Sequence, residues 1–195
     1  MTILAIETAT DICSAALVRD RAVLAHRSLS EKNIHSEKLL PMIDEILKES
    51  ALRLHDVDAV AVSIGPGSFT GLRIGLSAAK GLAMGAGISL VPVPTLDALA
   101  LETLHRIPKE DAVVCPLIEA KRDEAFFSFY SARNNFPLRA SEYEIAPAQT
   151  IVEKAKQYRS VVFAGNGAGK IKSTAAGEQS FHFRGDITCS AISVA

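Results

Sequence analysis

The stretch TILAIETATDICSAALVRDRAVLAHRSL, residues 2–29, contains three short apolar segments separated by the turn-like tripeptides ATD and RDR. Short β-rich segments bounded by turn residues predict consecutive antiparallel strands joined by hairpins. Residues 34–50 follow with apolar side chains at helical spacing, which predicts a helix. The apolar residues of that helix are Leu39, Ile43, Ile46 and Leu47.

Two further strands and two further helices are expected before residue 106. The segments VDAVAVSI (57–64) and GISLVPV (87–93) are almost entirely apolar, as strands buried on both faces are. Helices are expected at about 69–84, after Ser68, and from Thr95 onward. The chain therefore alternates strands and helices after its opening three strands.

The same order of elements then begins again. DAVVCPLIEA (111–120), EAFFSFYSA (124–132) and LRASEYEI (138–145) predict three strands, followed by a helix and a buried strand. Such a repeat is typical of α/β proteins built from duplicated units. We therefore predict an α/β fold with two related lobes, residues 1–105 and 106–195, each with a mixed sheet flanked by helices.

Composition excludes several classes of protein. The formal net charge of −1 provides no global field that would attract nucleic acid, so any RNA contact should be local or made through a partner. The N-terminus lacks a basic signal-peptide region and no apolar run reaches the roughly 18 residues of a membrane span, so we expect a cytoplasmic protein without membrane contact. The three cysteines include no C-x-x-C pair, which predicts reduced, buried thiols.

The glycine-rich segment SIGPGSFTGLRIG, residues 63–75, raises the question of a phosphate site. It does not match the dinucleotide fingerprint G-x-G-x-x-G, because Thr70 stands at the third glycine position after Gly65 and Gly67, and no P-loop lysine follows. We expect a structural turn in which Ser68 caps the next helix. An anion site at the helix N-terminus is the alternative.

A second glycine-rich segment, AGNGAGKI at residues 164–171, also departs from the P-loop pattern. Ala164 occupies the first glycine position and Ile171 replaces the magnesium-binding hydroxyl. A turn containing Gly165 and Gly167 after a buried strand could still accept an adenosine, which is the alternative here.

Few residues support catalysis or metal binding. The five histidines contain no H-x-x-x-H pair, and no G-x-S-x-G serine is present. Glu7 ends the first predicted strand, where an actin-type ATPase would hold magnesium-bound water. Its alternative interpretation is an acid in a turn or an interface.

The predicted helix after Ser68 places Gly71, Gly75 and Ala79 on one face, at every fourth residue. Each glycine costs a helix roughly 1 kcal/mol relative to alanine, and close approach of another backbone compensates for that cost. The face could pack on the chain's own sheet and first helix, or on a partner. The partner-binding set predicted on this basis is Leu39, Ile43, Ile46, Leu47, Gly71, Leu72, Gly75 and Ala79.

Four segments, ILAIETATDICSAAL (3–17), HSEKLLPMIDEIL (35–47), VDAVAVSIGPGSFTGLRIGLSAAKGLAMG (57–85) and VPVPTLDALA (91–100), resemble the TsaB (YeaZ) family of bacterial tRNA threonylcarbamoyladenosine biosynthesis proteins. The resemblance is close over residues 1 to about 130 and looser beyond. It implies an actin-like, ribonuclease H-like (ASKHA) fold of two lobes. Family members continue past the length of this chain, so the second lobe is expected to be truncated at Ala195.

The resemblance also implies a function. In the related catalytic subunit TsaD, the segment matching VPTLDALA carries two metal-binding histidines, and Thr95 and Leu99 stand at those positions here. The expectation is a non-catalytic scaffold that binds TsaD, recruits the ATPase TsaE and supports threonylcarbamoyladenosine formation at adenosine 37 of tRNAs reading ANN codons.

The same expectation extends to ligands and assembly. The protein is expected to contact tRNA only through the complex and to form a homodimer when TsaD is absent. It is expected to require no cofactor and no metal, and whether ATP or ADP binds at the partner interface is left open. The alternatives are a small ASKHA-type ATPase or kinase that uses Glu7 and the glycine turns, and a protease acting on TsaD.

Overall fold

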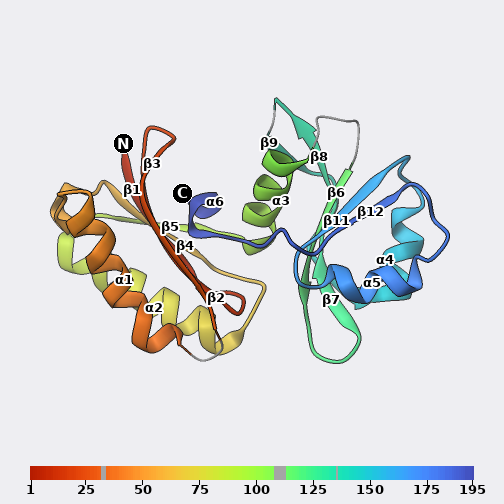
Figure 1. The fold of residues 1–195 in the computed structure, drawn as a ribbon, viewed down its shortest axis with the longest axis horizontal. Helices are drawn as coiled ribbons and strands as arrows, with labels where there is room; N and C mark the ends of the chain where they lie inside the picture. Colours follow the sequence, from red (N-terminus) through yellow and green to blue (C-terminus); the bar gives the residue numbers. More distant parts are fainter. Residues whose placement is uncertain (32–33, 108–112, 135) are drawn as a thin grey trace. The chain divides into compact units, whose positions relative to one another are not determined.

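The computed structural model describes residues 1–195 except 32–33, 108–112 and 135. The chain forms two compact units, Met1–Thr95 with Cys189–Ala195, and Leu96–Thr188. Each unit contains one mixed sheet with helices packed on it, which confirms the predicted α/β class (Figure 1).

The bounds of these units differ from the expected lobes 1–105 and 106–195. The chain crosses to the second unit at Leu96, one residue into the helix Thr95–Arg106, and returns to the first unit at Cys189. The return has a physical cause, since the short helix Ala191–Val194 packs on the first sheet.

The first sheet has the strand order β3-β2-β1-β4-β5. Its opening three strands are antiparallel, as predicted, while β1, β4 and β5 are parallel to one another. The register pairs Glu7 with Ser14 on β2, and Ile6 with Val62 on β4. The strands are β1 (Thr2–Glu7), β2 (Ile12–Arg19), β3 (Ala22–Ser30), β4 (Ala59–Ser63) and β5 (Ser89–Val93).

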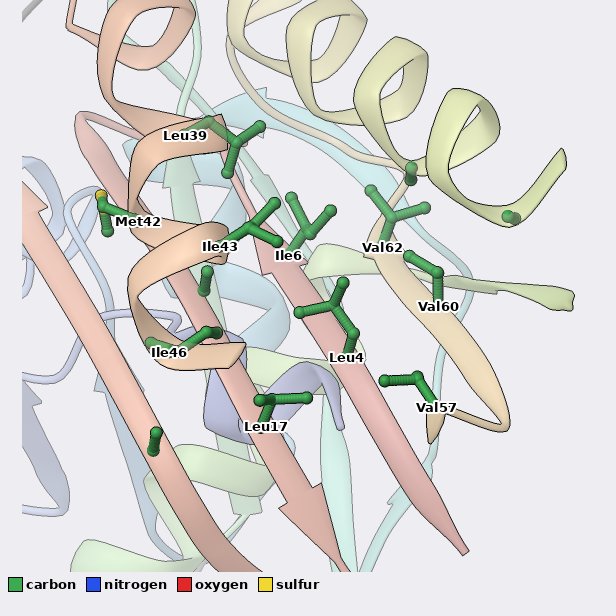
Figure 2. Packing of buried hydrophobic residues seen from close by; sticks show 14 of the residues in the cluster. Leu4, Ile6, Leu17, Leu39, Met42, Ile43, Ile46, Val57, Val60 and Val62 are labelled. Atoms are coloured by element: carbon green, nitrogen blue, oxygen red, sulfur yellow. The ribbon is translucent and has the colours of Figure 1, made fainter. Parts of the chain in front are cut away.

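Helices α1 and α2 cover one face of this sheet and helix α6 covers the other (Figure 1). Figure 2 shows Leu39, Ile43 and Ile46 of α1 pointing at Leu4 and Ile6 of β1. The packed aliphatic side chains exclude water, which is the main stabilising contribution of such a core. The helical elements are α1 (His35–Glu49), a 3-10 turn η1 (Leu54–Asp56), α2 (Phe69–Ala86) and α6 (Ala191–Val194).

The second unit is built around a seven-stranded sheet with the path β10-β7-β6-β11-β12, and β8 pairs with both β6 and β9. The strand predicted over 124–132 is two strands, β7 and β8, because Ser128 and Phe129 separate the pairing of β7 with β10 from that of β8 with β9. The strands are β6 (Val113–Glu119), β7 (Glu124–Phe127), β8 (Tyr130–Arg133), β9 (Phe136–Arg139), β10 (Glu144–Pro147), β11 (Val161–Ala164) and β12 (Phe181–Arg184). The helices are α3 (Thr95–Arg106), α4 (Ala148–Ala155) and α5 (Ala168–Thr174).

Candidate functional site

Glu7 ends β1 and has no solvent-exposed surface. Its Oε1 accepts a hydrogen bond from the backbone N–H of Ala9 at 2.6 Å, and its Oε2 accepts one from the Ser63 hydroxyl at the end of β4. The Cys189 thiol donates a third, with Sγ 3.2 Å from Oε2. Both carboxylate oxygens are therefore bound by groups of the protein itself.

Burial raises the pKa of the Glu7 carboxyl above its ordinary value, while the donors from Ser63, Ala9 and Cys189 lower it in part. Desolvation dominates because the ionised form loses its water shell, and three hydrogen bonds replace that shell incompletely. In this environment Glu7 connects β1, β4 and the C-terminal segment. This matches the interpretation as a structural acid better than the one as a ligand of metal-bound water.

The first glycine turn is held by internal hydrogen bonds. The N–H of Gly65 donates to Thr95 Oγ1 at 3.1 Å, and the N–H of Thr95 donates back to the Gly65 carbonyl at 2.8 Å. A side chain on Gly67 could not fit, because its Cβ would lie 2.2 Å from the Ala9 carbonyl oxygen. The turn thus needs glycine for close packing on the β1–β2 connection.

Ser68 caps α2 as predicted. Its side chain accepts a hydrogen bond from the Gly71 N–H at 3.2 Å, and its own N–H donates to the Ala9 carbonyl at 2.7 Å. A cavity of about 380 Å³ opens beside this turn and is lined in part by Ser68 and Thr70. Anion binding at Gly65, Gly67 and Ser68 stays a prediction.

The second glycine turn packs tightly on β6. A Cβ on Gly165 would lie 2.3 Å from the Leu117 carbonyl oxygen, and the Gly167 N–H donates to that same oxygen at 3.3 Å. The neighbouring Lys170 ammonium pairs with Glu119 at 2.9 Å and donates to the Arg122 carbonyl at 2.6 Å. These contacts give Gly165 and Gly167 a packing role, and adenosine binding there stays a prediction.

Most residues of the predicted partner-binding set are buried within the first unit. The inner face of α2 packs on the β1–β2 connection: a Cβ on Gly71 would lie 2.1 Å from the Thr8 carbonyl oxygen, and a Cβ on Gly75 would lie 2.1 Å from Thr8 Oγ1. Ala79 is fully buried on the same face. Four more members of the set lie on α1 and belong to the same core. Of these, Leu39, Ile43 and Ile46 are buried, and Leu47 packs against them. Leu72 is half-buried against Gly65.

The outer face of α2 carries a second stripe of small residues, which the predicted partner-binding set does not include. Ser77, Gly81 and Gly85 also recur at every fourth position, and all three are exposed. Nothing lies within 4 Å of a Cβ built on either glycine. The spacing was visible in the sequence, and only the position of α2 on the sheet reveals which of the two stripes faces solvent.

Large apolar side chains surround this outer stripe. Leu40 on α1 is 53% exposed, and Phe69 and Met84 on α2 are 68% and 83% exposed. The Arg73 guanidinium stacks on the Phe69 ring, with its carbon 3.7 Å from the ring centroid, an arrangement that favours a planar cation. A groove of about 390 Å³ between α1 and α2 is bordered by Leu40, Arg73 and Ser77.

Thr95 and Leu99 have structural roles. Thr95 is fully buried and accepts the Gly65 hydrogen bond, and Leu99 is buried beside Gly165. Between them, Asp97 accepts hydrogen bonds from the hydroxyls of Tyr130 at 2.6 Å and Tyr143 at 2.8 Å. In the part of the chain that the structure describes, no group of three or more His, Cys, Asp or Glu side chains could hold a metal ion.

Comparison with known proteins identifies the family of this chain. The family model for TsaD, tRNA N6-adenosine threonylcarbamoyltransferase, matches residues 22–192. The tRNA threonylcarbamoyladenosine biosynthesis protein TsaB of Escherichia coli is 38% identical over 170 residues, which are 87% of this chain and 72% of that protein. The chain belongs to the TsaB family. TsaB of Haemophilus influenzae is 41% identical over 128 residues, 66% of this chain, and the match spans about half of that relative, 53%.

Solved structures confirm the expected fold. YeaZ from Pseudomonas aeruginosa superposes with a TM-score of 0.87 at 25% identity, covering 99% of this chain and 88% of that one. A ROK hexokinase from Thermus thermophilus shares the architecture with a TM-score of 0.53 at 10% identity, covering 94% and 92%. The chain thus shares its two-unit α/β fold with YeaZ and with this hexokinase. Among the described residues, no helix is both long and apolar enough to span a bilayer.

Proposed function

We propose that this TsaB-family chain is a non-catalytic subunit in the formation of threonylcarbamoyladenosine at adenosine 37 of tRNAs that read ANN codons. It binds TsaD, supports recruitment of the ATPase TsaE, and contacts tRNA only through the complex. The proposal places the protein in the cytoplasm and requires no cofactor.

The observation that supports the non-catalytic role is the internal hydrogen bonding of the Glu7 carboxylate. A carboxylate that positions magnesium-bound water must present an oxygen to its ligand, and both oxygens of Glu7 are bound by Ala9, Ser63 and Cys189 instead. A phosphotransferase also stabilises the charge that develops on phosphate with positioned donors. The N–H groups of Gly65 and Gly167 are directed inward, which supports a scaffold over an ASKHA-type ATPase or kinase.

The partner surface we propose is the outer face of α1 and α2, defined by Leu40, Phe69, Ser77, Gly81 and Met84. Exposed apolar patches mark interaction sites, and small residues at every fourth position let a second helix approach closely. TsaD would occupy this face in the complex. In its absence a second copy of the chain would pair there through the same two helices, because a twofold contact uses one patch on both partners.

The same surface is where we propose that ATP or ADP binds, at the interface with the partner. Calorimetry on the complex and on each subunit alone would test whether the nucleotide binds there. ATP turnover near 1 per second by the purified chain alone, an ordinary enzymatic rate, would favour the kinase alternative.

Reconstitution tests the proposed role with a matched pair of variants. The wild-type chain, mixed with TsaD, TsaE and the remaining substrates, should support threonylcarbamoyladenosine formation. Gly81→Leu places a bulky side chain on the outer stripe and should weaken TsaD binding by roughly ten- to a hundredfold, the equivalent of about 1–3 kcal/mol of overpacking. Gly81→Ala should retain most of the binding. Equal TsaD affinity for all three proteins would exclude this face as the interface.

A further inference from the structure

The exposed face of α2 carries charge of one sign only. The 18 residues of this helix include Arg73 and Lys80 and no aspartate or glutamate. Both cations are exposed, and their spacing of seven residues, about two helical turns, places them on the same side of the helix as Ser77 and Met84. The apolar and small residues of the proposed partner surface are therefore accompanied by two positive charges.

Neither cation is neutralised within the chain. The Arg73 guanidinium stacks on the Phe69 ring, a contact that leaves its positive charge in place. Among the residues that the structure describes, neither Arg73 nor Lys80 forms an ion pair. On the neighbouring helix, by contrast, the Lys48 ammonium lies 2.5 Å from the Asp44 carboxylate. The two cations of α2 are thus available to an anionic group from outside.

The groove between α1 and α2 has the same electrostatic character. The described residues that line it include Arg73 and no carboxylate. Glu37 and Glu45 of α1 line a different groove, together with Arg27 of β3, and Asp11 lines the cavity at the first turn of α2. The lining of the α1–α2 groove therefore provides no negative charge to offset Arg73.

We propose that the outer face of α2 selects its partner by charge, and that the helix docked on it carries carboxylates opposite Arg73 and Lys80. Complementary charges across an interface speed the encounter and disfavour wrong partners. An apolar, basic face with small residues at every fourth position fits an amphipathic helix with acidic residues beside its apolar stripe. This inference rests on the proposed partner surface and specifies the chemistry of the partner.

The same charges disfavour a second copy of the chain. A twofold contact brings one patch of both copies together, so Arg73 and Lys80 of one copy would meet those of the other. No carboxylate of α2 would separate them. Like charges that are brought together reduce affinity, which is a recognised source of specificity. Pairing with TsaD and pairing with a second copy should therefore respond to salt in opposite directions.

Salt dependence is the first test of this inference. Calorimetry with TsaD and sedimentation of the chain alone are compared at about 0.1 M and about 1 M sodium chloride, where the screening length falls from about 10 Å to about 3 Å. The affinity for TsaD should fall by about tenfold, as expected for two exposed ion pairs, and self-association should strengthen. An affinity for TsaD that is unchanged or higher at high salt would overturn the inference, as would self-association that weakens.

Charge reversal at Lys80 is the second test. Lys80→Glu should lower the affinity for TsaD by about tenfold at low salt and strengthen self-association, and both effects should shrink at high salt. Lys80→Arg keeps the charge and should bind TsaD like the wild type. Lys121→Glu makes the same change in net charge at an exposed residue of the second unit, and it should also bind TsaD like the wild type.

The variant Gly81→Leu separates failure of this inference from failure of the proposed surface. If Gly81→Leu weakens TsaD binding while Lys80→Glu binds as the wild type does, α2 is the partner surface and its partner helix is not acidic. If neither variant changes the affinity, the proposed surface itself is wrong. Circular dichroism melts of each variant show whether a loss of binding reflects a loss of folding, and Lys80→Glu should melt like the wild type because Lys80 is exposed.

Discussion

Replacing Gly71 with alanine tests most sharply how α2 is attached to its sheet. The added Cβ would lie 2.1 Å from the carbonyl oxygen of Thr8 and 3.3 Å from its carbonyl carbon. An ordinary contact needs at least 3.4 Å, and the obstacle is backbone, so either the helix or the β1–β2 connection must move by more than 1 Å. Overpacking of this kind costs about 3 kcal/mol at the upper end of the usual range.

The helix itself gains up to about 1 kcal/mol when glycine becomes alanine, which leaves a net destabilisation of about 2 kcal/mol. For a unit of about 100 residues this corresponds to a melting temperature roughly 8–16 °C lower. Gly81→Ala makes the same chemical change in the same helix, where nothing lies within 4 Å. It should stabilise the protein by up to about 1 kcal/mol. Gly75→Ala should fall between the two, because its obstacle is the Thr8 hydroxyl.

The assay is urea unfolding followed by circular dichroism, with calorimetry for the melting temperature. The reasoning predicts the order Gly81→Ala, wild type, Gly75→Ala and Gly71→Ala, from most to least stable. A Gly71→Ala protein as stable as the wild type would show that α2 does not rest on Thr8. If Gly71→Ala lost self-association while its stability stayed unchanged, Gly71 would have to be part of the partner-binding surface.

Three further predictions concern buried polar groups and metal. The Thr8 hydroxyl is buried without a hydrogen-bond partner among the described residues, so Thr8→Val should raise the free energy of unfolding by about 1 kcal/mol. A lower free energy of unfolding for this variant, measured by urea titration, would show that the hydroxyl does have a partner. Because burial raises the pKa of Glu7 above 4.5, the folded state holds a proton that the unfolded state has released, and stability should fall as pH rises from 4.5 through that pKa. Glu7→Gln should remove this component of the pH profile, and an identical profile for both proteins would contradict the assigned shift. The purified chain should contain no stoichiometric zinc or iron, and one metal per chain by elemental analysis would refute this.

Much of the fold followed from local pattern. The three opening strands, the helix containing Leu39 and Ile43, and the Ser68 cap depend on periodicity and turn chemistry within a few residues, and the structure contains all of them. The break between β7 and β8 was missed, because it is caused by pairing with β9 and β10 instead of by a turn residue.

The candidate site was harder to predict, because it depends on tertiary position. The stripe of Gly71 and Gly75 and the stripe of Gly81 and Gly85 have the same spacing in sequence, and only contact with Thr8 separates the buried stripe from the exposed one. The contact between Glu7 and Cys189 joins residues from opposite ends of the chain. No local pattern indicates a contact of that range, which is also why the expected lobe boundary omitted the return of the chain at Cys189.

Threonylcarbamoyladenosine in bulk tRNA is the most direct measure of the proposed function. In cells whose own TsaB is depleted, expression of this chain should restore the modified nucleoside, detected by mass spectrometry of digested tRNA. Gly81→Leu, expressed at the same level and equally folded, should fail to restore it, because the outer face of α2 would no longer accept TsaD. Absence of the modified nucleoside despite a folded, abundant wild-type chain would contradict the proposed role, and full restoration by Gly81→Leu would contradict the proposed surface.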